Sequence, residues 1–194
     1  MTDNGSEPVA DSVEVRPGER NLTELMDGLG HVRSAPKEVG TLELIVARPA
    51  VDERVELALA ELEVDRGLMA DRWNRGSRSN PKSQLTVMNV RATRLVAGDR
   101  SRWALAGDQL YVDFDLSSEN IPPGTRLAIG SAVIEVSDQP HLGCEKFAAR
   151  FGPIARAFAN SPDGTAVNFR GINTQVVQGG TVRVGDEVRR LPST

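Results

Sequence analysis

The feature that most constrains the fold is a succession of short apolar segments with a period of two, broken by glycine and proline. Apolar residues occupy every second position in residues 42–46 and again in residues 55–59. Side chains of a strand point alternately to its two faces, so this period predicts half-buried strands. The second segment, extended to Leu62, also satisfies helical spacing, and we favour a strand there.

Two further apolar segments contain a glycine turn at their middle. Gly130 and Ser131 interrupt residues 127–136, and Gly179 and Gly180 interrupt residues 176–184. Glycine adopts positive φ at little cost, so both segments predict β-hairpins. Several short strands in a chain with 18 Gly and 11 Pro predict a mainly β fold, a closed or nearly closed β-barrel with a few short helices.

The first 39 residues differ from this pattern. Residues 1–20 contain five acids, two bases and no aromatic residue, a composition that predicts a disordered acidic tail. Apolar residues then recur at helical spacing behind a possible cap at Asn21, and Gly30 is placed to end that helix. We therefore expect a tail over residues 1–20, a helix and linker over 21–39, and the main domain over 40–191.

Charge and cysteine content exclude several classes of protein. With 23 basic and 27 acidic residues the formal charge is −4, so nothing predicts a general nucleic-acid or membrane-surface binder. No apolar run is long enough to span a membrane, and the N-terminus lacks the features of a signal peptide. The single cysteine forms no internal disulfide, and one Cys with two His is too few for a usual structural zinc site. We predict a cytoplasmic protein.

A helix is predicted directly after that cysteine, Cys144. Large apolar residues recur there at spacings of 4, 3 and 4, with an interruption at Gly152: Phe147, Phe151, Ile154 and Phe158. A helix N-terminus carries partial positive charge, which favours thiolate over thiol, and His141 and Lys146 are close enough in sequence to add to this effect. Gly143 leaves room for a bulky partner beside the sulfur. A buried, inert cysteine is the open alternative.

A basic segment is the second candidate site. Residues 71–82, DRWNRGSRSNPK, contain four bases and one acid in a chain that is acidic elsewhere. Such a loop can direct backbone N–H groups and arginine side chains toward a phosphate or another oxyanion. A solvated loop with no specific role is the alternative.

These residues together resemble a known family. The sequence contains, in order, GLMADR at 67–72, DLSSENI at 115–121, GSAVIEV at 130–136, PHLGC at 140–144, RGI at 170–172 and GGTVRVGD at 179–186. Over about residues 40–190 this order and spacing resembles MOSC domains, named for the C-terminal region of molybdenum cofactor sulfurases. The resemblance implies a β-barrel-like fold and a cysteine that carries sulfur or meets molybdenum.

The resemblance also implies a cofactor site. The molybdenum cofactor is a pterin dithiolene with a phosphate, so we expect Arg72, Lys146 and Arg170 to bind its charged groups. Asn120, beside Glu119, is the candidate for the pterin edge, although both residues could simply serve a turn. Cys144 is the candidate metal ligand or persulfide carrier, with His141 beside it.

Three functions remain open. In the first, a cysteine desulfurase that carries its own pyridoxal phosphate passes sulfur to Cys144, and the persulfide goes on to a metal–sulfur centre. In the second, the protein is a small molybdenum-dependent oxidoreductase that reduces N-hydroxylated compounds. In the third, it is a non-catalytic cofactor-binding module. We rank them in this order.

Overall fold

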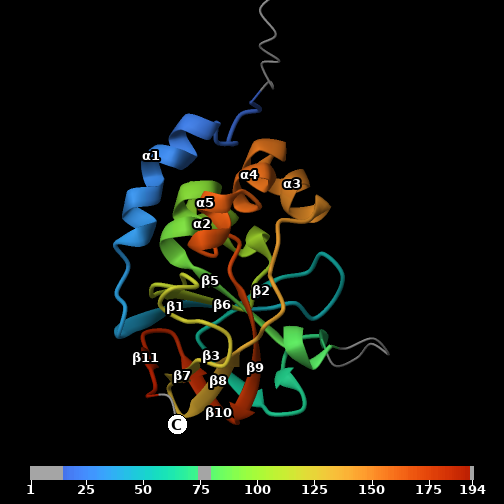
Figure 1. Cartoon of the computed structure of the whole chain (residues 1–194). Helices are drawn as coiled ribbons and strands as arrows, with labels where there is room; N and C mark the ends of the chain where they lie inside the picture. Colours follow the sequence, from blue (N-terminus) through green and yellow to red (C-terminus); the bar gives the residue numbers. More distant parts are fainter. Residues whose placement is uncertain (1–14, 74–79, 193–194) are drawn as a thin grey trace, which may run out of the picture.

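Seven strands close into a barrel in the computed structural model, which describes residues 15–73 and 80–192 (Figure 1). Their order is β11-β7-β8-β9-β5-β6-β1, and β1 pairs with β11 to close the barrel. Neighbours are antiparallel except β5 and β6. β2 extends the sheet beyond β1, whereas β3, β4 and β10 form a small separate sheet. The strands are β1 (Val39–Ala47), β2 (Val55–Leu57), β3 (Leu59–Glu63), β4 (Gly67–Leu68), β5 (Leu85–Asn89), β6 (Leu110–Asp113), β7 (Arg126–Ile129), β8 (Ala132–Val136), β9 (Ile172–Gln178), β10 (Gly180–Arg183) and β11 (Glu187–Arg190).

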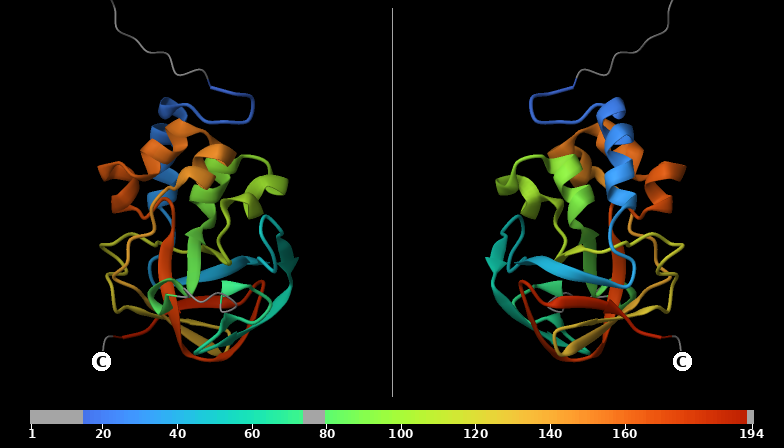
Figure 2. Two further views of the ribbon diagram at one scale, coloured as in Figure 1. Left: turned by 90° about the vertical axis from the view of Figure 1, so that its right-hand side faces the viewer. Right: turned by 90° about the vertical axis from the view of Figure 1, so that its left-hand side faces the viewer.

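The helices gather at one end of the barrel, as the side views show (Figure 2). Their apolar faces form a second core against the outer face of the strands, which is separate from the core inside the barrel. The mainly β, closed-barrel prediction is therefore confirmed. The helices are α1 (Leu22–Arg33), α2 (Val90–Ala97), α3 (Glu145–Phe151), α4 (Pro153–Ala159) and α5 (Pro162–Ala166), with short 3-10 turns η2 (Pro81–Ser83) and η3 (Arg100–Ala106).

β1 serves both cores. A bulge between Leu42 and Leu44 changes the face to which the following side chains point. Leu42 and Ile45 consequently lie inside the barrel, and Leu44 and Val46 lie under the helices. The sequence pattern predicts that one face of this strand is buried, whereas in the structure both faces of β1 are buried.

The first predicted hairpin is confirmed and the second is wrong. β7 and β8 pair across Gly130, as expected. β9 instead pairs with β8 and β5, while β10 crosses to β3 in the small sheet. Both edges of β9 are occupied by β8 and β5, so no edge is left for β10. Gly180 packs closely against Ser131, where a Cβ atom would lie 2.6 Å from the backbone.

α1 is longer than the sequence indicated. It begins behind the predicted cap, where Asn21 and Glu24 form a reciprocal capping box, but it continues past Gly30 to Arg33. Gly30 is in open space, whereas a Cβ atom at Gly28 would clash with Leu95 of α2 at 2.4 Å. A glycine in α1 therefore allows two helices to pack closely and does not end the helix.

The predicted tail is described only in part, since residues 1–14 lie outside the described residues. Residues 15–20 contact the helical end of the molecule. The Nε atom of Arg20 donates to the Leu95 carbonyl at 3.0 Å, and Arg102 donates to the carbonyl of Gly18. This part of the expected tail, up to residue 20, thus packs against the domain.

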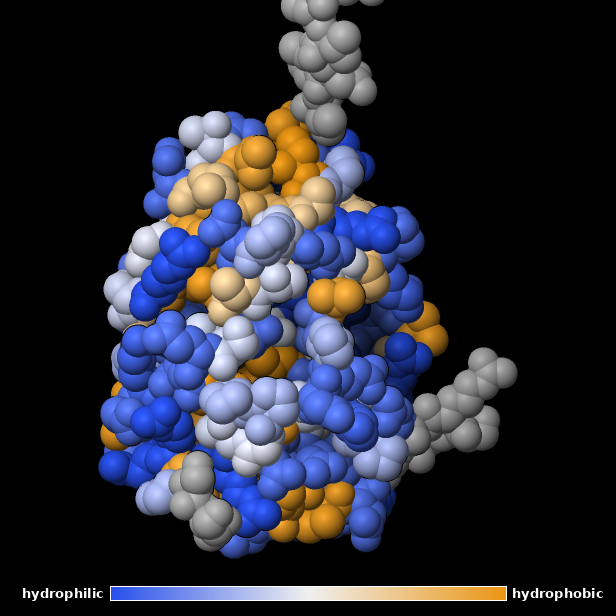
Figure 3. All heavy atoms as spheres, in the orientation of Figure 1, coloured by the Kyte–Doolittle hydropathy of each residue, from blue (hydrophilic) through white to orange (hydrophobic). Residues whose placement is uncertain are grey.

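The face shown in Figure 3 is largely hydrophilic, with an apolar region at the helical end and smaller apolar patches elsewhere. A groove of about 630 Å³ lies there between α1 and α4, lined by Leu22, Met26, Ile154 and Phe158 among others. Within the described part of the chain, no helix has both the length and the apolar character that crossing a bilayer requires.

Candidate functional site

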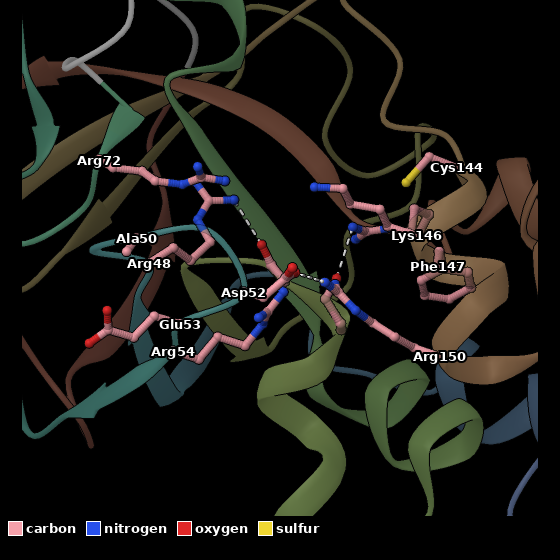
Figure 4. A pocket seen from close by; sticks show the side chains of 13 residues that line it. Arg48, Ala50, Asp52, Glu53, Arg54, Arg72, Cys144, Lys146, Phe147 and Arg150 are labelled. Atoms are coloured by element: carbon pink, nitrogen blue, oxygen red, sulfur yellow. Dashed lines mark hydrogen bonds and ion pairs between the residues drawn. The ribbon is translucent and has the colours of Figure 1, made fainter.

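A cationic cavity of about 190 Å³ lies between α3 and the turn that joins β1 to β2 (Figure 4). Two acidic residues, Asp52 and Glu53, also line it, and so does Cys144. Six cationic side chains line it: Arg48, Arg54, Arg72, Lys146, Arg150 and Arg170. The cavity therefore carries an excess of positive charge, which attracts anions.

Cys144 is exposed and is the N-cap residue of α3. The predicted helix is confirmed, including its restart at Pro153. The loop before the cysteine is held by Asn160, which accepts from the Gly143 N–H at 2.7 Å and donates to the Gly143 carbonyl at 3.0 Å. A Cβ atom on Gly143 would meet Arg156 and Asn160 at 3.3 Å. Gly143 therefore serves packing against α4, and the expectation that it leaves room for a partner is corrected.

Arg170 enters the cavity from a buried position. The chain can pass close to β5 because residue 171 is glycine, with φ 97° and a hypothetical Cβ atom 2.4 Å from the Val87 carbonyl oxygen. Arg170 donates to Asp108 at 2.6 Å and to the Ala106 carbonyl at 3.0 Å. Its guanidinium carbon lies 5.0 Å from the ring centre of Phe147, and its Nε atom has no partner. The Arg170 side chain is thus held in one position, and its Nε–H group is a donor without an acceptor.

Asp108 joins Arg170 to His141. Its Oδ1 atom lies 3.5 Å from the Nδ1 atom of His141, and its side chain is fully buried. Burial raises the pKa of Asp108, and the charge of Arg170 opposes that rise. Burial and the charges of Arg170 and Arg48 hold the pKa of His141 well below its usual value of 6.5. His141 is therefore neutral at pH 7.

Arg48 forms the opposite wall of the cavity. Its Nε atom donates to Asp71 at 2.8 Å and its Nη1 atom to the Gly107 carbonyl at 2.8 Å. Asp71 is buried, and it also accepts from the backbone N–H of Trp73 at 2.9 Å. Asp71, the one acidic residue of the basic segment, thus fixes both the Arg48 side chain and the backbone at Trp73. Residues 74–79 of that segment lie outside the described residues.

The structure brings only some of the predicted site residues together. Arg72, Lys146 and Arg170 line the cavity with Cys144. His141 does not line it and borders a different cavity of about 160 Å³. Its Nδ1 atom lies 3.5 Å from Asp108, which in turn pairs with Arg170 of the cationic cavity.

Glu119 and Asn120 lie apart, in another cavity of about 450 Å³. The Asn120 amide donates to the carbonyls of Lys37 and Asp115 at 3.1 and 2.9 Å. These bonds connect two loops and use both donors of the amide. Neither residue lines the cationic cavity, so the structure does not bring them together with the other predicted site residues, and their contact with the pterin stays a prediction.

Sequence reasoning missed three arginines that line the cavity, and also Asp108, which is buried behind Arg170. Arg150 follows Lys146 by one helical turn, so the two could have been placed on one face. Arg48 follows the last residue of a strand and Asp108 precedes one, positions at which polar side chains often belong to sites. Arg54 carries no such signal, because its place depends on how the turn between β1 and β2 folds back.

The described residues contain no group of three or more His, Cys, Asp or Glu side chains arranged to hold a metal ion. A metal at Cys144 would therefore need further ligands from elsewhere. A dithiolene would supply two such ligands. Its sulfur atoms are soft donors, as is a cysteine thiolate, so both kinds of ligand suit the same soft metals.

Several solved structures have a fold similar to that of this chain. The YuaD protein of Bacillus subtilis is 15% identical, with a TM-score of 0.54, and the match covers 80% of this chain and 97% of that one. YiiM from Escherichia coli is 19% identical, with a TM-score of 0.53, over 79% and 71% of the two chains. A hypothetical protein is 18% identical, with a TM-score of 0.59, over 81% and 70%. These likenesses define the class of fold.

The family model described as the MOSC domain matches residues 71–189, more than half of the chain. The protein belongs to the MOSC domain family, which is associated with the molybdenum cofactor. The resemblance seen in the sequence motifs is thereby confirmed. No curated protein matches the chain.

Acidification is expected to destabilise the protein through His141. The unfolded-state histidine gains a proton near pH 6.5, whereas the buried His141 does not, so the unfolded state binds more protons as the pH falls. The free energy of unfolding should fall by up to about 1.4 kcal/mol per pH unit below about pH 6.5, until the folded-state pKa is reached. Urea unfolding between about pH 7 and pH 5 measures this slope.

The control is His141→Gln, which retains Asp108 and every other titrating group. We expect the variant to be less stable at neutral pH but to have a shallower slope below about pH 6.5. Equal slopes in the two proteins would mean that His141 is protonated in the folded state.

Proposed function

We propose that the protein binds the molybdenum cofactor in the cationic cavity, with the Cys144 thiolate as a soft sulfur donor toward the metal centre. One observation carries the proposal: an exposed cysteine lines the same cavity as six cationic side chains. A ligand that combines a phosphate, an anionic dithiolene and a thiophilic metal fits this combination of groups.

The donor set supports the fit. Arg54 and Arg170 each have a buried Nε atom without a partner, and an anionic ligand would satisfy such donors. The volume of about 190 Å³ is smaller than pockets that enclose a whole drug-sized ligand, which start near 300 Å³. The cavity therefore suits the charged groups of the cofactor, and the rest of a pterin would extend beyond it.

Each residue has a distinct role in this proposal. Arg170 would bind an anionic group from a fixed position, because Asp108 and the Ala106 carbonyl hold its guanidinium. Lys146 and Arg72 would add charge from opposite sides, as Figure 4 shows. When bound, the cofactor would supply a molybdenum centre for redox or sulfur chemistry. The protein would hold that centre beside Cys144.

Retention of the cofactor tests the proposal. Protein purified without oxygen from its native host is expected to carry molybdenum and pterin, measured by metal analysis and pterin fluorescence. Arg72→Ala should retain about tenfold less, because it loses one charge-assisted contact worth about 1.4 kcal/mol.

The matched control is Arg126→Ala, since Arg126 pairs with Glu135 outside the cavity. This variant should retain the cofactor like the unchanged protein, and circular dichroism should show both variants folded. If Arg72→Ala retains as much cofactor as the control variant, Arg72 does not contribute to cofactor binding. If neither molybdenum nor pterin accompanies the unchanged protein, the cofactor proposal fails.

A second function is favoured by the exposure of Cys144. A persulfide donor protein can reach an exposed sulfur. In the transfer, the Cys144 thiolate attacks the outer sulfur of the donor persulfide, the new S–S bond forms at Cys144, and the donor leaves as a thiolate. We propose that a cysteine desulfurase, which holds its own pyridoxal phosphate, is the donor. A permanent metal ligand at Cys144 would instead support the small oxidoreductase.

A further inference from the structure

We infer that Cys144 exchanges sulfur with small thiol compounds that carry an acid group close to their sulfur, and that the cationic cavity selects these compounds over cationic ones. The inference rests on the persulfide transfer proposed for Cys144 and adds a chemical class of partner to it. Its basis is the charge that surrounds the sulfur atom.

The backbone on either side of Cys144 is anchored to α4. Asn160 bonds to both the N–H and the carbonyl of Gly143. Glu145 forms an ion pair with Arg156 of the same helix. Cys144 is the N-cap residue of α3, but its side chain makes no capping hydrogen bond. The sulfur is therefore held at the cationic cavity and remains available for a bond to another sulfur atom.

Half of the cations that line the cavity are already paired with a carboxylate. These pairs are Arg48–Asp71, Arg150–Asp52 and Arg170–Asp108. Arg54, Arg72 and Lys146 have no ion-pair partner among the residues that the structure describes. Glu53 also lines the cavity and offsets at most one of these charges. The cavity therefore keeps an excess of positive charge.

Lys146 and Arg72 bring this excess close to the sulfur. Figure 4 shows the two side chains extending toward each other from opposite sides of the cavity, with the sulfur of Cys144 on the Lys146 side. Lys146 belongs to the first turn of α3, directly after the cysteine. A compound that approaches the sulfur thus meets cations without a counter-ion, which attract an acid group and repel an amine.

A buried arginine points to the same class of ligand. The side chain of Arg170 is only 7% exposed, and its Nε atom has no hydrogen-bond partner. A buried donor without an acceptor is costly, and Arg170 lines the same cavity as Cys144. An acid group in the cavity would bring acceptor oxygen atoms to this wall.

The volume of the cavity limits the size of the group that enters it. The volume of about 190 Å³ is well below the roughly 300 Å³ at which pockets for drug-sized ligands begin. A carboxylate or sulfonate on a short chain suits this space, whereas a folded protein would reach the sulfur only from outside. The geometry therefore favours a small compound as the partner.

The exchange needs no further reagent. The Cys144 thiolate attacks one sulfur of the compound's disulfide, or the outer sulfur of its persulfide. The new S–S bond forms at Cys144, the old S–S bond breaks, and the rest of the compound leaves as a thiolate with its acid group. The compound is itself the oxidant, and Cys144 is oxidised.

The charge of the whole chain predicts the opposite preference. The formal charge is −4, which would favour cationic reagents at an ordinary surface thiol. A preference of Cys144 for anionic reagents must therefore come from the cavity.

Two methanethiosulfonate reagents test the preference, because they differ in the charge of the group that they transfer. The sulfonatoethyl reagent transfers an anion and the trimethylammonioethyl reagent a cation, and both release methanesulfinate. The ratio of the two rates at one pH does not depend on how much of the thiol is ionised. Relative to free mercaptoethanol, the metal-free protein should favour the anionic reagent by about tenfold or more at low ionic strength, and high salt should remove the preference.

Lys146→Gln and Arg72→Gln should each lower this normalised ratio about threefold, because each removes one unpaired cation. Arg126→Gln is the matched control, with the same loss of charge in an ion pair outside the cavity, and its ratio should not change. Circular dichroism should show all three variants folded. The disulfides of mercaptopropionate and cysteamine, which are an anionic and a cationic thiol compound, should follow the same order as the reagents.

The inference is overturned if the normalised ratio shows no preference for the anionic reagent, or if Arg126→Gln lowers the ratio as much as the two cavity variants do. It is also overturned if neither cavity variant changes the ratio. Loading of Cys144 by a desulfurase without the anionic preference would reject the inference and leave the carrier function standing. The anionic preference without loading by a desulfurase would support the inference and reject that donor.

Discussion

Incubation of the metal-free protein with a cysteine desulfurase, its pyridoxal phosphate and cysteine is expected to convert most of Cys144 to a persulfide. The sulfur is exposed and lines the cationic cavity, so a donor protein can reach it. Mass spectrometry of the intact protein should show the addition of one sulfur atom, and peptide analysis should locate it at Cys144.

Cys144→Ser provides the control, because the chain then contains no thiol. We expect no sulfur addition to this variant. A control acceptor protein, loaded in the same reaction, establishes that the donor is active. If the acceptor is loaded and Cys144 is not, the carrier function is rejected, and a role of Cys144 as a metal ligand or in cofactor storage is favoured.

Removing Arg170 is expected to cost about 3–5 kcal/mol of unfolding free energy, the largest stability effect that we predict. The side chains of Arg170 and Asp108 are only 7% and 0% exposed, and they pair at 2.6 Å. Arg170→Ala leaves the Asp108 carboxylate buried without its cation, so the cost reflects an uncompensated charge. Urea unfolding at neutral pH measures the change.

The double variant Asp108→Asn, Arg170→Gln separates this cause from lost packing. Both partners become neutral amides, so no unpaired charge remains in the interior. The double variant should therefore be more stable than Arg170→Ala. If it is equally unstable or worse, the loss arises from packing against Phe147 and not from the charge of Asp108.

Local patterns in the sequence predicted the elements well. The helix after Cys144 follows from the spacing of four apolar residues, and its restart follows from Gly152 and Pro153. β7 and β8 follow from two apolar runs around Gly130. In each case the determining residues lie within one turn or one hairpin of each other, where periodicity and glycine geometry decide the structure.

Contacts between distant segments could not be predicted in this way. The pairing of β10 with β3 joins residues far apart in the chain, such as Gly180 and Leu62. Asn120 was taken for a ligand-binding residue because its amide suits a pterin edge, yet the same amide also suits the two loop carbonyls that it binds. Composition does not distinguish these uses.

The same reason applies to the cavity. Arg72 and Arg170 could be chosen from segments that resemble the family, and Lys146 could be chosen because it lies two residues after Cys144. The convergence of Arg54 and Arg150 above Gly107 requires the folded turn between β1 and β2, and no spacing rule places those residues together.

The pairing of β1 with β11 determines when the barrel can close during folding. Thr41 lies opposite Glu187, so the ring of strands is completed by residues almost 150 positions apart. Contacts of such long separation slow folding, because the entropy of closing the intervening loop is lost before the contact is gained. On the ribosome, strand closure must wait until the last strand has emerged. The residues that line the cavity, the last of which is Arg170, are thus all synthesised before β11 can close the barrel.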